Sequence, residues 1–301
     1  MRIINNIIAN SVPILPKRIV KLIADKYVAG SNEKDAIKTT QYLNSNKYKV
    51  TIDLLGEHVS QIKEADQVTD IYIELLNEIH KLKLSSNISV KPTHIGLDLG
   101  FEIFKKNALQ LVKHASKLNN FVRFDMEDSK TTDDTIKMFK MLYQDYQNIG
   151  TVFQAYLKRT YYDIETMDKQ INFRLCKGIY NEDPSIAYKD AVKINKNYLN
   201  IAKLAFKKGH YIGLATHDLE LTKQLYLLIE KYNVSSSNFE FQVLYGVPMH
   251  GWLQKHLDNN YKVRVYLPYG PQWYEYSIRR LKENPNIARY VLKSLFSKRN
   301  Y

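Results

Sequence analysis

Two adjacent arginines, Arg279 and Arg280, are the residues of this chain whose type and spacing point most directly to chemistry. In a helix that begins near residue 273, Tyr276, Arg280 and Glu283 share one face and Arg279 lies beside them. Paired guanidinium groups match the planar oxygens of a carboxylate, and Glu283 is near enough to hold them in place. The tyrosine adds a flat wall. This face predicts a site for a small amino or imino acid; a solvated surface helix is the alternative interpretation.

The elements that must position this helix are read from the hydrophobic periodicity. Helical patterns separate eight strand-like runs, which cover residues 50–56, 87–98, 120–127, 150–157, 171–180, 211–218, 239–246 and 262–270. Alternating strands and helices imply parallel pairing, and eight units predict an α/β fold of the (β/α)8 TIM-like barrel type. We expect extra N-terminal helices over residues 1–46, packed on a single catalytic domain over residues 47–301, with the last helix over the C-terminal mouth. A doubly wound open sheet is the structural rival, but its glycine-rich first turn is absent.

Polar side chains stand at the ends of the predicted strands, where barrel enzymes place their active sites. Each of them also has an ordinary structural explanation, but together they predict a chemically loaded rim. They are Glu57, Lys91, Asp125, Gln154, Arg174, Lys177, Tyr180, Thr216, His217, Gln242, Tyr245 and Tyr266.

The charge of the chain favours an anionic partner. The formal net charge is +13, and residues 261–301 hold nine basic and two acidic residues. Such a bias can attract nucleic acid, an anionic membrane surface or an anionic ligand, but no nucleic-acid-binding motif is present, so no nucleic acid is expected. The basic segment after Pro285 is amphipathic, which predicts either peripheral contact with a membrane or a helix packed on the barrel. A single cysteine, Cys176, and the lack of an apolar run of about 20 residues predict a cytoplasmic protein.

The catalytic motifs that are absent narrow the chemistry. The chain has no G-x-G-x-x-G, Walker A or G-x-S-x-G sequence, and its eight histidines form no H-E-x-x-H motif or close cluster, so no tightly bound metal is expected. A rim rich in cations, amides and aromatic rings suits a large anionic cofactor that supplies its own redox chemistry. In this interpretation Arg174 approaches a flavin ring and Lys177 neutralises its pyrophosphate.

Seven runs of sequence, in order, resemble the strand motifs of one enzyme family. They are SVKPTHIGLD, VRFDMED, VFQAYLKR, FRLCKGIY, ATHD, EFQVLYG and RVYLPYGPQWYEYSIRRLKEN, and they span about residues 50–290. They are similar to the flavin-dependent proline dehydrogenases, also called proline oxidases, of the monofunctional bacterial type. The resemblance implies non-covalent FAD, oxidation of L-proline to 1-pyrroline-5-carboxylate and electron transfer to a membrane quinone. It also implies a separate pyrroline-5-carboxylate dehydrogenase as the downstream enzyme, because the aldehyde dehydrogenase part of the bifunctional enzymes is absent from this chain.

The resemblance also implies roles for individual residues by matching position. Lys91, Arg279 and Arg280 would bind the proline carboxylate, and Glu283 would hold the arginines. Asp125 and Arg174 would form the catalytic pair. The cofactor-binding residues would be Met126, Gln154, Lys177, Gly178, Ile179, Thr216 and His217, and the walls of the proline site would be Tyr180, Leu244, Tyr266 and Tyr276.

Ile179 is the one notable departure, because the family commonly has alanine after K-G, and the extra bulk puts the local fit of flavin and substrate in question. Two alternatives stay open. One is another FAD-dependent barrel oxidoreductase, such as the methylenetetrahydrofolate reductase type. The other is a basic barrel without enzymatic activity that binds an anionic partner.

Overall fold

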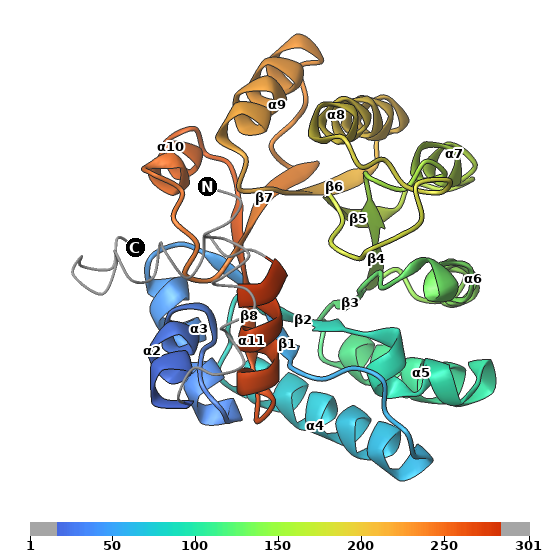
Figure 1. The fold of residues 1–301 in the computed structure, drawn as a ribbon, viewed down its shortest axis with the longest axis vertical. Helices are drawn as coiled ribbons and strands as arrows, with labels where there is room; N and C mark the ends of the chain where they lie inside the picture. Colours follow the sequence, from blue (N-terminus) through green and yellow to red (C-terminus); the bar gives the residue numbers. More distant parts are fainter. Residues whose placement is uncertain (1–16, 284–301) are drawn as a thin grey trace.

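The computed structural model describes residues 17–283, apart from the side chains of residues 17–19, 22–23 and 279–283 (Figure 1). Eight parallel strands close into a barrel in chain order, which confirms the predicted (β/α)8 fold. The strands are β1 Lys49–Leu54, β2 Ser86–Val90, β3 Val122–Phe124, β4 Ile149–Gln154, β5 Asn172–Cys176, β6 Tyr211–Ala215, β7 Phe239–Leu244 and β8 Val263–Tyr269.

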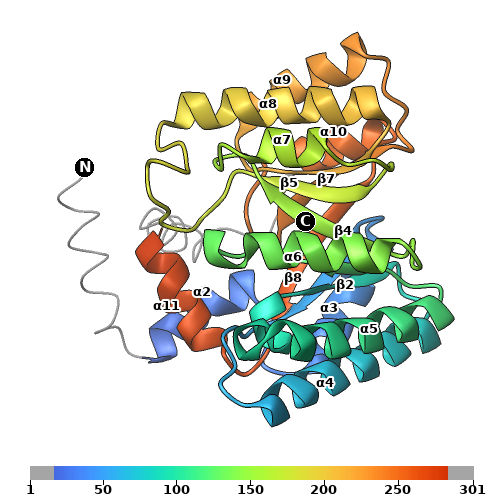
Figure 2. The ribbon, with the colours of Figure 1, turned by 90° about the vertical axis from the view of Figure 1, so that its right-hand side faces the viewer.

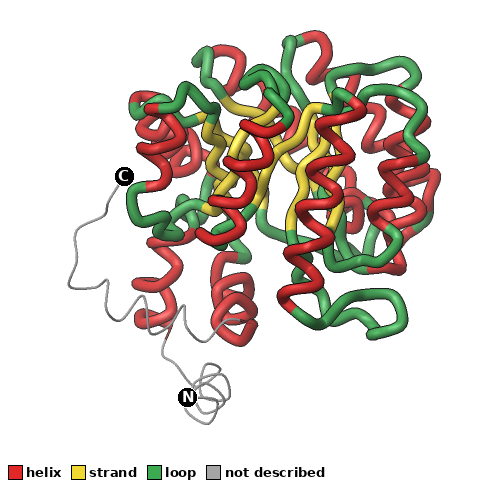
Figure 3. The backbone as a smooth tube through the Cα atoms, turned by 90° about the horizontal axis from the view of Figure 1, so that it is seen from above, coloured by secondary structure: helices red, strands yellow, loops and turns green. Residues whose placement is uncertain are grey.

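Helices follow the strands and form the outer layer (Figures 1 and 3). They are α4 Ile62–Lys81, α5 Phe101–Lys117, α6 Ser129–Tyr143, α7 Thr160–Glu165, α8 Ala191–Lys208, α9 Leu219–Lys231, α10 Trp252–Asp258 and α11 Trp273–Glu283. Two further helices, α2 Lys17–Tyr27 and α3 Glu33–Ser45, precede β1. No helix within residues 17–283 is long and apolar enough to cross a bilayer.

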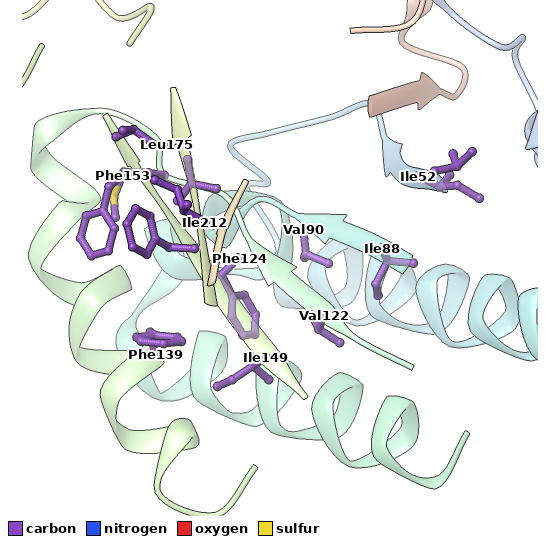
Figure 4. Packing of buried hydrophobic residues seen from close by; sticks show 14 of the residues in the cluster. Ile52, Ile88, Val90, Val122, Phe124, Phe139, Ile149, Phe153, Leu175 and Ile212 are labelled. Atoms are coloured by element: carbon purple, nitrogen blue, oxygen red, sulfur yellow. The ribbon is translucent and has the colours of Figure 1, made fainter. Parts of the chain in front are cut away.

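The apolar core lies between the strands and the helices. Ile52, Ile88, Val122, Phe124 and Leu175 alternate with inward residues along their strands, and Phe139 from α6 packs with this outer layer (Figure 4). The interior of the barrel is instead lined by polar and charged side chains, which hydrogen bond across the barrel. These residues are Thr51, Asp53, Asn87, Ser89, Arg123, Asp125, Arg174, Glu240, Gln242 and Arg264. Branched apolar side chains fill most barrels of this class, so the polar interior marks this one as built around a site.

Strand β2 is shorter than its apolar pattern predicts. The strand ends at Val90, and the predicted run to residue 98 continues as two 3-10 turns, η2 Pro92–Ile95 and η3 Leu97–Leu99. Pro92 has no backbone N–H to donate to a ladder, so the extended pairing cannot continue past it. The early end of the strand leaves Lys91 at the barrel mouth as the residue just before η2.

Helix α4 anchors the two strands that carry the first polar residues of the interior. Its N-terminus has a capping box between Gln61 and Glu64. Farther along, the buried Tyr72 hydroxyl accepts a hydrogen bond from Leu54 N and donates one to Ser89 O, at 3.1 and 2.9 Å. One phenol therefore fixes β1 and β2 to each other where their carboxyl ends reach the mouth.

Helix α11 packs beside α2 at the mouth of the barrel (Figure 2). Tyr276 on α11 is buried in a small cluster with Val28 and Leu55. The chain after α2 is tied to the end of β8 by hydrogen bonds from Ala29 N to Pro268 O and from Gly270 N to Gly30 O, at 2.9 and 3.0 Å. The N-terminal helices thus support the segment from which α11 begins.

Candidate active site

The carboxyl ends of β2, β3, β5 and β8 bring four predicted site residues together. Arg174 Nη1 donates to Asp125 Oδ1 at 2.8 Å, and the Tyr266 hydroxyl donates to Asp125 Oδ2 at 2.9 Å. The Tyr266 ring covers the guanidinium, with 4.8 Å from Arg174 Cζ to the ring centroid. Lys91 lies near enough that Asp125 helps to raise its pKa. The predicted pairing of Asp125 with Arg174 therefore exists as a buried contact.

Asp125 is held on both of its oxygens. Ser89 Oγ donates to Oδ1 at 2.5 Å, which is the same oxygen that receives Arg174, while Tyr266 takes Oδ2. Arg174 Nη2 also donates to Ser89 Oγ at 3.1 Å. Burial opposes the charge of Arg174, but Asp125, with smaller contributions from Tyr266 and Cys176, more than offsets this effect, so the guanidinium pKa is raised. Asp125 therefore orients Arg174 and keeps it charged.

A second buried ion pair joins Lys91 to Asp53. Lys91 Nζ lies 2.9 Å from each carboxylate oxygen of Asp53, and the side chains are 12% and 2% exposed. Burial, then the neighbouring Asp125, raise the pKa of Asp53, and Lys91 opposes that rise. Burial lowers the pKa of Lys91, but the carboxylates of Asp53 and Asp125 outweigh it and raise the value. Both cations of the floor are therefore charged.

A polar column beneath Arg174 fixes its direction. Arg174 Nε donates to Gln242 Oε1 at 2.8 Å, and Gln242 Nε2 donates to Glu240 Oε1 at 2.7 Å. Arg264 Nε contacts the same oxygen of Glu240 at 2.6 Å. Burial opposes ionisation of Glu240, but Arg264, Arg123 and Gln242 together outweigh it, so the pKa falls to about 2. Because a carboxylate only accepts hydrogen bonds, Glu240 fixes which end of the Gln242 amide faces Arg174.

The loop after β5 carries three of the predicted cofactor residues to the rim. Lys177 Nζ pairs with Asp218 Oδ2 at 2.6 Å, and the lysine side chain is 33% exposed. Gly178 has a positive φ of 108°, and a Cβ there would lie 2.1 Å from the Tyr156 ring. Only glycine fits this conformation and this approach to the ring. Ile179 is exposed, so the described part of the chain does not enclose its side chain.

The other predicted cofactor residues surround this loop. Gln154 is buried, and its Nε2 donates to Glu127 O at 2.8 Å. Thr216 Oγ1 accepts from Asp218 N at 3.1 Å, and His217 Nε2 accepts from Leu244 N at 2.9 Å. His217 is therefore the tautomer that carries its proton on Nδ1. Met126 is buried in the main core beyond β3.

The residues predicted to wall the substrate divide into two groups. Tyr266 lies on the floor beside Arg174, and Leu244 ends β7 half-buried at the mouth. Tyr180 is half-buried in the loop after β5. Tyr276, on α11 at the mouth, is buried against Val28 and Leu55. The side chains of Arg279, Arg280 and Glu283 lie outside the described residues, although the backbone of α11 continues to residue 283.

The strand-end argument missed two residues of the floor, Asp53 and Ser89. Both lie inside short strand runs next to apolar residues, where a polar residue reads as part of an ordinary strand. A signal was present, because Asp53 alternates with Thr51 and Ser89 with Asn87, so each strand has a polar inward face. Within residues 17–283, no group of three or more His, Cys, Asp or Glu side chains is placed so that it could hold a metal ion. Burial raises the pKa of Cys176 to about 11, so its thiol stays protonated.

The floor suits a small carboxylate with an apolar body. The floor holds two ion pairs, Asp53 with Lys91 and Asp125 with Arg174, so the described floor has no net charge. Lys91 can donate a charge-assisted hydrogen bond to an anion while it stays paired with Asp53. The phenol of Tyr266 adds a flat face beside Arg174. Lys177 at the rim adds a charge suited to a larger anionic ligand.

Comparison with known proteins gives one consistent family. The family model described as "Proline dehydrogenase" matches residues 36–291. "Proline dehydrogenase 1" of Bacillus subtilis (strain 168) is 36% identical over 280 residues, which is 92% of each chain. "Proline dehydrogenase" of Deinococcus radiodurans is 32% identical over 280 residues, 91% of this chain and 90% of that protein.

The solved structures show the same barrel inside a longer protein. Proline utilization A from Bdellovibrio bacteriovorus, inactivated by N-propargylglycine, superposes with a TM-score of 0.80 at 23% identity. The match covers 91% of this chain and 34% of that protein, so this chain spans about a third of its length. At this level of identity the likeness concerns the fold.

Proposed function

This chain belongs to the proline dehydrogenase family, and from that membership we propose that it oxidises L-proline to 1-pyrroline-5-carboxylate with non-covalently bound FAD. As a member of the family it is an oxidoreductase that acts on proline. The observation that supports the finer proposal is the pair of buried, charge-paired cations, Lys91 and Arg174, at the mouth of a barrel whose last helix carries two arginines.

The substrate would be held by its carboxylate. Lys91 has a donor left beyond those taken by Asp53, and Arg279 and Arg280 stand on the helix that follows β8, with Glu283 to hold them. Tyr266, Leu244, Tyr180 and Tyr276 would enclose the ring. Three cations around one carboxylate fix the orientation of a small rigid substrate, and orientation of that kind supplies much of a rate enhancement.

The rim has the residues that a flavin dinucleotide requires. Lys177 offers a cation for the pyrophosphate, and Gly178 lets the backbone approach closely where a Cβ would meet Tyr156. Gln154, Ile179, Thr216 and His217 would line the remainder, with Met126 beside the ring. When bound there, FAD would supply the redox chemistry, as the acceptor of the hydride from C5 of proline. Arg174, kept charged by Asp125, would stabilise negative charge on the ring.

In this proposal the amine proton leaves to solvent, and Asp125 is not its acceptor. The carboxylate already accepts hydrogen bonds from Ser89 and Arg174 on Oδ1 and from Tyr266 on Oδ2, which leaves at most one acceptor position, on Oδ2, and ties the group to Arg174. Its role in this proposal is to orient Arg174. The ring nitrogen of proline would therefore lose its proton to solvent before the site closes over the substrate.

The broader role proposed for the protein is the first step of proline degradation to glutamate. Electrons would pass to a membrane quinone, and a separate pyrroline-5-carboxylate dehydrogenase would consume the product. We place the protein in the cytoplasm, with possible peripheral contact at the inner face of the membrane; the basic segment after Pro285 that motivated this contact lies outside the described residues. One catalytic domain, residues 47–301, would carry the activity, with residues 1–46 packed on it.

The deciding experiment is anaerobic mixing of the purified protein with L-proline. A yellow protein whose flavin absorbance bleaches supports the proposal. A colourless folded protein would favour a non-enzymatic anion-binding barrel, and a flavin that proline does not reduce would favour another flavin barrel such as the methylenetetrahydrofolate reductase type.

Substitution of Arg280 tests the assignment of the carboxylate site. Arg280→Met should raise the KM for proline by about two orders of magnitude, because one charged hydrogen-bond partner of the carboxylate is lost, while flavin content and spectrum stay unchanged. Lys231→Met, an exposed change of equal charge at the end of α9, is the matched control and should leave KM unchanged. Loss of flavin in Arg280→Met would contradict the assigned role.

A further inference from the structure

Asp53 is a buried carboxylate whose part in the function proposed above is limited to its ion pair with Lys91. We propose that Asp53 is a positioning residue, which holds the Lys91 ammonium charged and directs its remaining N–H toward the substrate carboxylate. This inference rests on the proposed oxidation of proline and adds a residue that the strand-end pattern did not single out.

The contact between the two residues is close and symmetrical. Both oxygens of Asp53 lie 2.9 Å from Lys91 Nζ. An ammonium has three tetrahedral N–H groups, and a carboxylate that engages two of them leaves the third on the opposite side. A lysine side chain has a flexible four-carbon stem, so without the contact to Asp53 the ammonium could adopt many positions.

The strand pairing of the backbone fixes the position from which Asp53 contacts Lys91. Asp53 is paired in register with Ser89 on β2 and with Pro268 on β8. The Tyr72 hydroxyl then binds Leu54 N and Ser89 O, which lie next to the pair on both strands. The carboxylate is therefore preorganised by the closed barrel before any ligand arrives.

Other groups around Lys91 cannot replace Asp53. The charged and titratable groups that act on the ammonium are Asp53 from β1, Asp125 and Glu127 after β3, and His94 from η2; Tyr266 from β8 acts on Asp53 itself. The charge of Asp125 also raises the pKa of Lys91, but its hydrogen bonds go to Ser89, Arg174 and Tyr266, whereas those of Lys91 Nζ go to Asp53. Glu127 accepts from Thr93 N and Thr93 Oγ1, at 2.9 and 2.6 Å. Burial, with a contribution from Lys91, lowers the pKa of His94 to about 3, so it stays neutral.

Removal of the Asp53 charge would therefore act through Lys91. A buried ammonium that loses its paired carboxylate is penalised by desolvation, so its pKa falls. At neutral to alkaline pH part of the protein would then carry neutral Lys91, which cannot pair with the substrate carboxylate. The proline KM would rise, and it would rise further as the pH increases.

The test uses the flavin-loaded full chain with two readouts, the KM for proline and the Kd of tetrahydrofuran-2-carboxylate. The second molecule has the carboxylate and the five-membered ring but no amine to oxidise, so it reports binding alone. Asp53→Asn should raise both values about 10- to 100-fold, with a KM that increases between pH 6 and 9 while the wild-type KM reflects only the substrate amine. Flavin content should not change.

A surface pair supplies the matched control. Lys106 Nζ lies 3.1 Å from both oxygens of Asp66, in the same geometry as the pair of Lys91 with Asp53, but these side chains are 61% and 39% exposed. Asp66→Asn removes an equivalent charge from an equivalent contact. It should leave both values within twofold of wild type.

Coupling to Lys91 separates positioning from a general structural effect. In a Lys91→Met background, Asp53→Asn should change the Kd of tetrahydrofuran-2-carboxylate less than twofold, because the residue through which it acts is gone. Equal fold-changes in both backgrounds would overturn the inference. Should Asp53→Asn fail to fold, Asp53→Glu carries the test: it keeps the charge but displaces the carboxylate by one methylene, so KM should rise at least tenfold, and a wild-type KM would overturn the inference.

The outcomes also separate this inference from the proposed function. A wild-type protein whose flavin is not reduced by proline would defeat the proposed function first. Reduction by proline together with unchanged Asp53→Asn binding would leave the proposed function intact and defeat the role of Asp53 alone.

Discussion

Replacement of Gly213 by alanine should lower the free energy of unfolding by about 2–5 kcal/mol, although the residue lies in an ordinary strand conformation. Gly213 lies on β6 and its missing side chain faces the barrel interior. A Cβ there would lie 2.4 Å from Gln242 Nε2 and 2.8 Å from Gln242 Cδ. The amide of Gln242 must therefore move.

The magnitude follows from what holds that amide. Gln242 Oε1 accepts from Arg174 at 2.8 Å, and Nε2 donates to Glu240 at 2.7 Å, so movement gives up two hydrogen bonds to charged groups. Each contributes about 1.5–3 kcal/mol, and each partner is left buried. Alanine restores about 0.4–1 kcal/mol by restricting the unfolded chain. The loss dominates, and activity with proline should fall as well because Arg174 loses one of its supports.

The assay is urea denaturation of four flavin-loaded proteins: wild type, Gly213→Ala, Gln242→Ser and the double variant. Serine lacks the two atoms that the new Cβ would meet, so in that background Gly213→Ala should be neutral or stabilising by about 0.4–1 kcal/mol. Whether Gly213→Ala raises or lowers the free energy of unfolding would thus depend on the residue at position 242 on the neighbouring strand. Equal destabilisation in both backgrounds would refute the reasoning.

A second glycine provides the control. A Cβ at Gly150 on β4 would lie 2.5 Å from the backbone oxygen of Asn172, which cannot turn aside as a side chain can. Gly150→Ala should therefore be destabilising with either glutamine or serine at position 242. Rescue of Gly150→Ala by Gln242→Ser would show that the effect at residue 213 is not specific to the amide.

Two further predictions concern buried polar groups. Burial lowers the pKa values of His94, His210 and His256 to about 3, 4 and 3, so the unfolded chain binds protons first as the pH falls below about 6.5. The stability that these three neutral histidines contribute should be complete above that pH, and below it the free energy of unfolding should decline by up to about 4 kcal/mol per pH unit near pH 5. In urea titrations, His256→Phe should reduce this slope by about one proton, or about 1.4 kcal/mol per pH unit. An unchanged slope would contradict the buried neutral state of His256. Tyr266→Phe removes the donor to Asp125 Oδ2 but keeps the ring over Arg174. The free energy of unfolding should therefore fall by about 1–3 kcal/mol, with flavin content unchanged. Unaltered stability together with unaltered proline kinetics would show that this hydrogen bond has no role.

The fold and the rim of the site follow from local patterns. Eight alternations of a two-residue and a 3.6-residue hydrophobic period predict the barrel, because each period records which side of a strand or helix is buried. Position alone predicts that Lys91, Asp125, Arg174 and Tyr266 lie near one another, because the carboxyl ends of parallel strands share one edge. The length of β2 was overestimated, since the strand-like run predicted over residues 87–98 continues past the strand end at Val90 into the turn that begins at Pro92.

What the sequence determines by itself is therefore the succession of elements and the residue types at their ends, because both depend on neighbours within a few positions. Only the tertiary structure decides which carboxylate meets which cation. Asp53 meets Lys91 across 38 positions and Asp125 meets Arg174 across 49, and these partners are selected by strand register and barrel closure. The same closure turns Ser89 and Gln242 from unremarkable strand residues into supports of the site, because a hydrogen bond depends on distances in space that separation along the chain does not record.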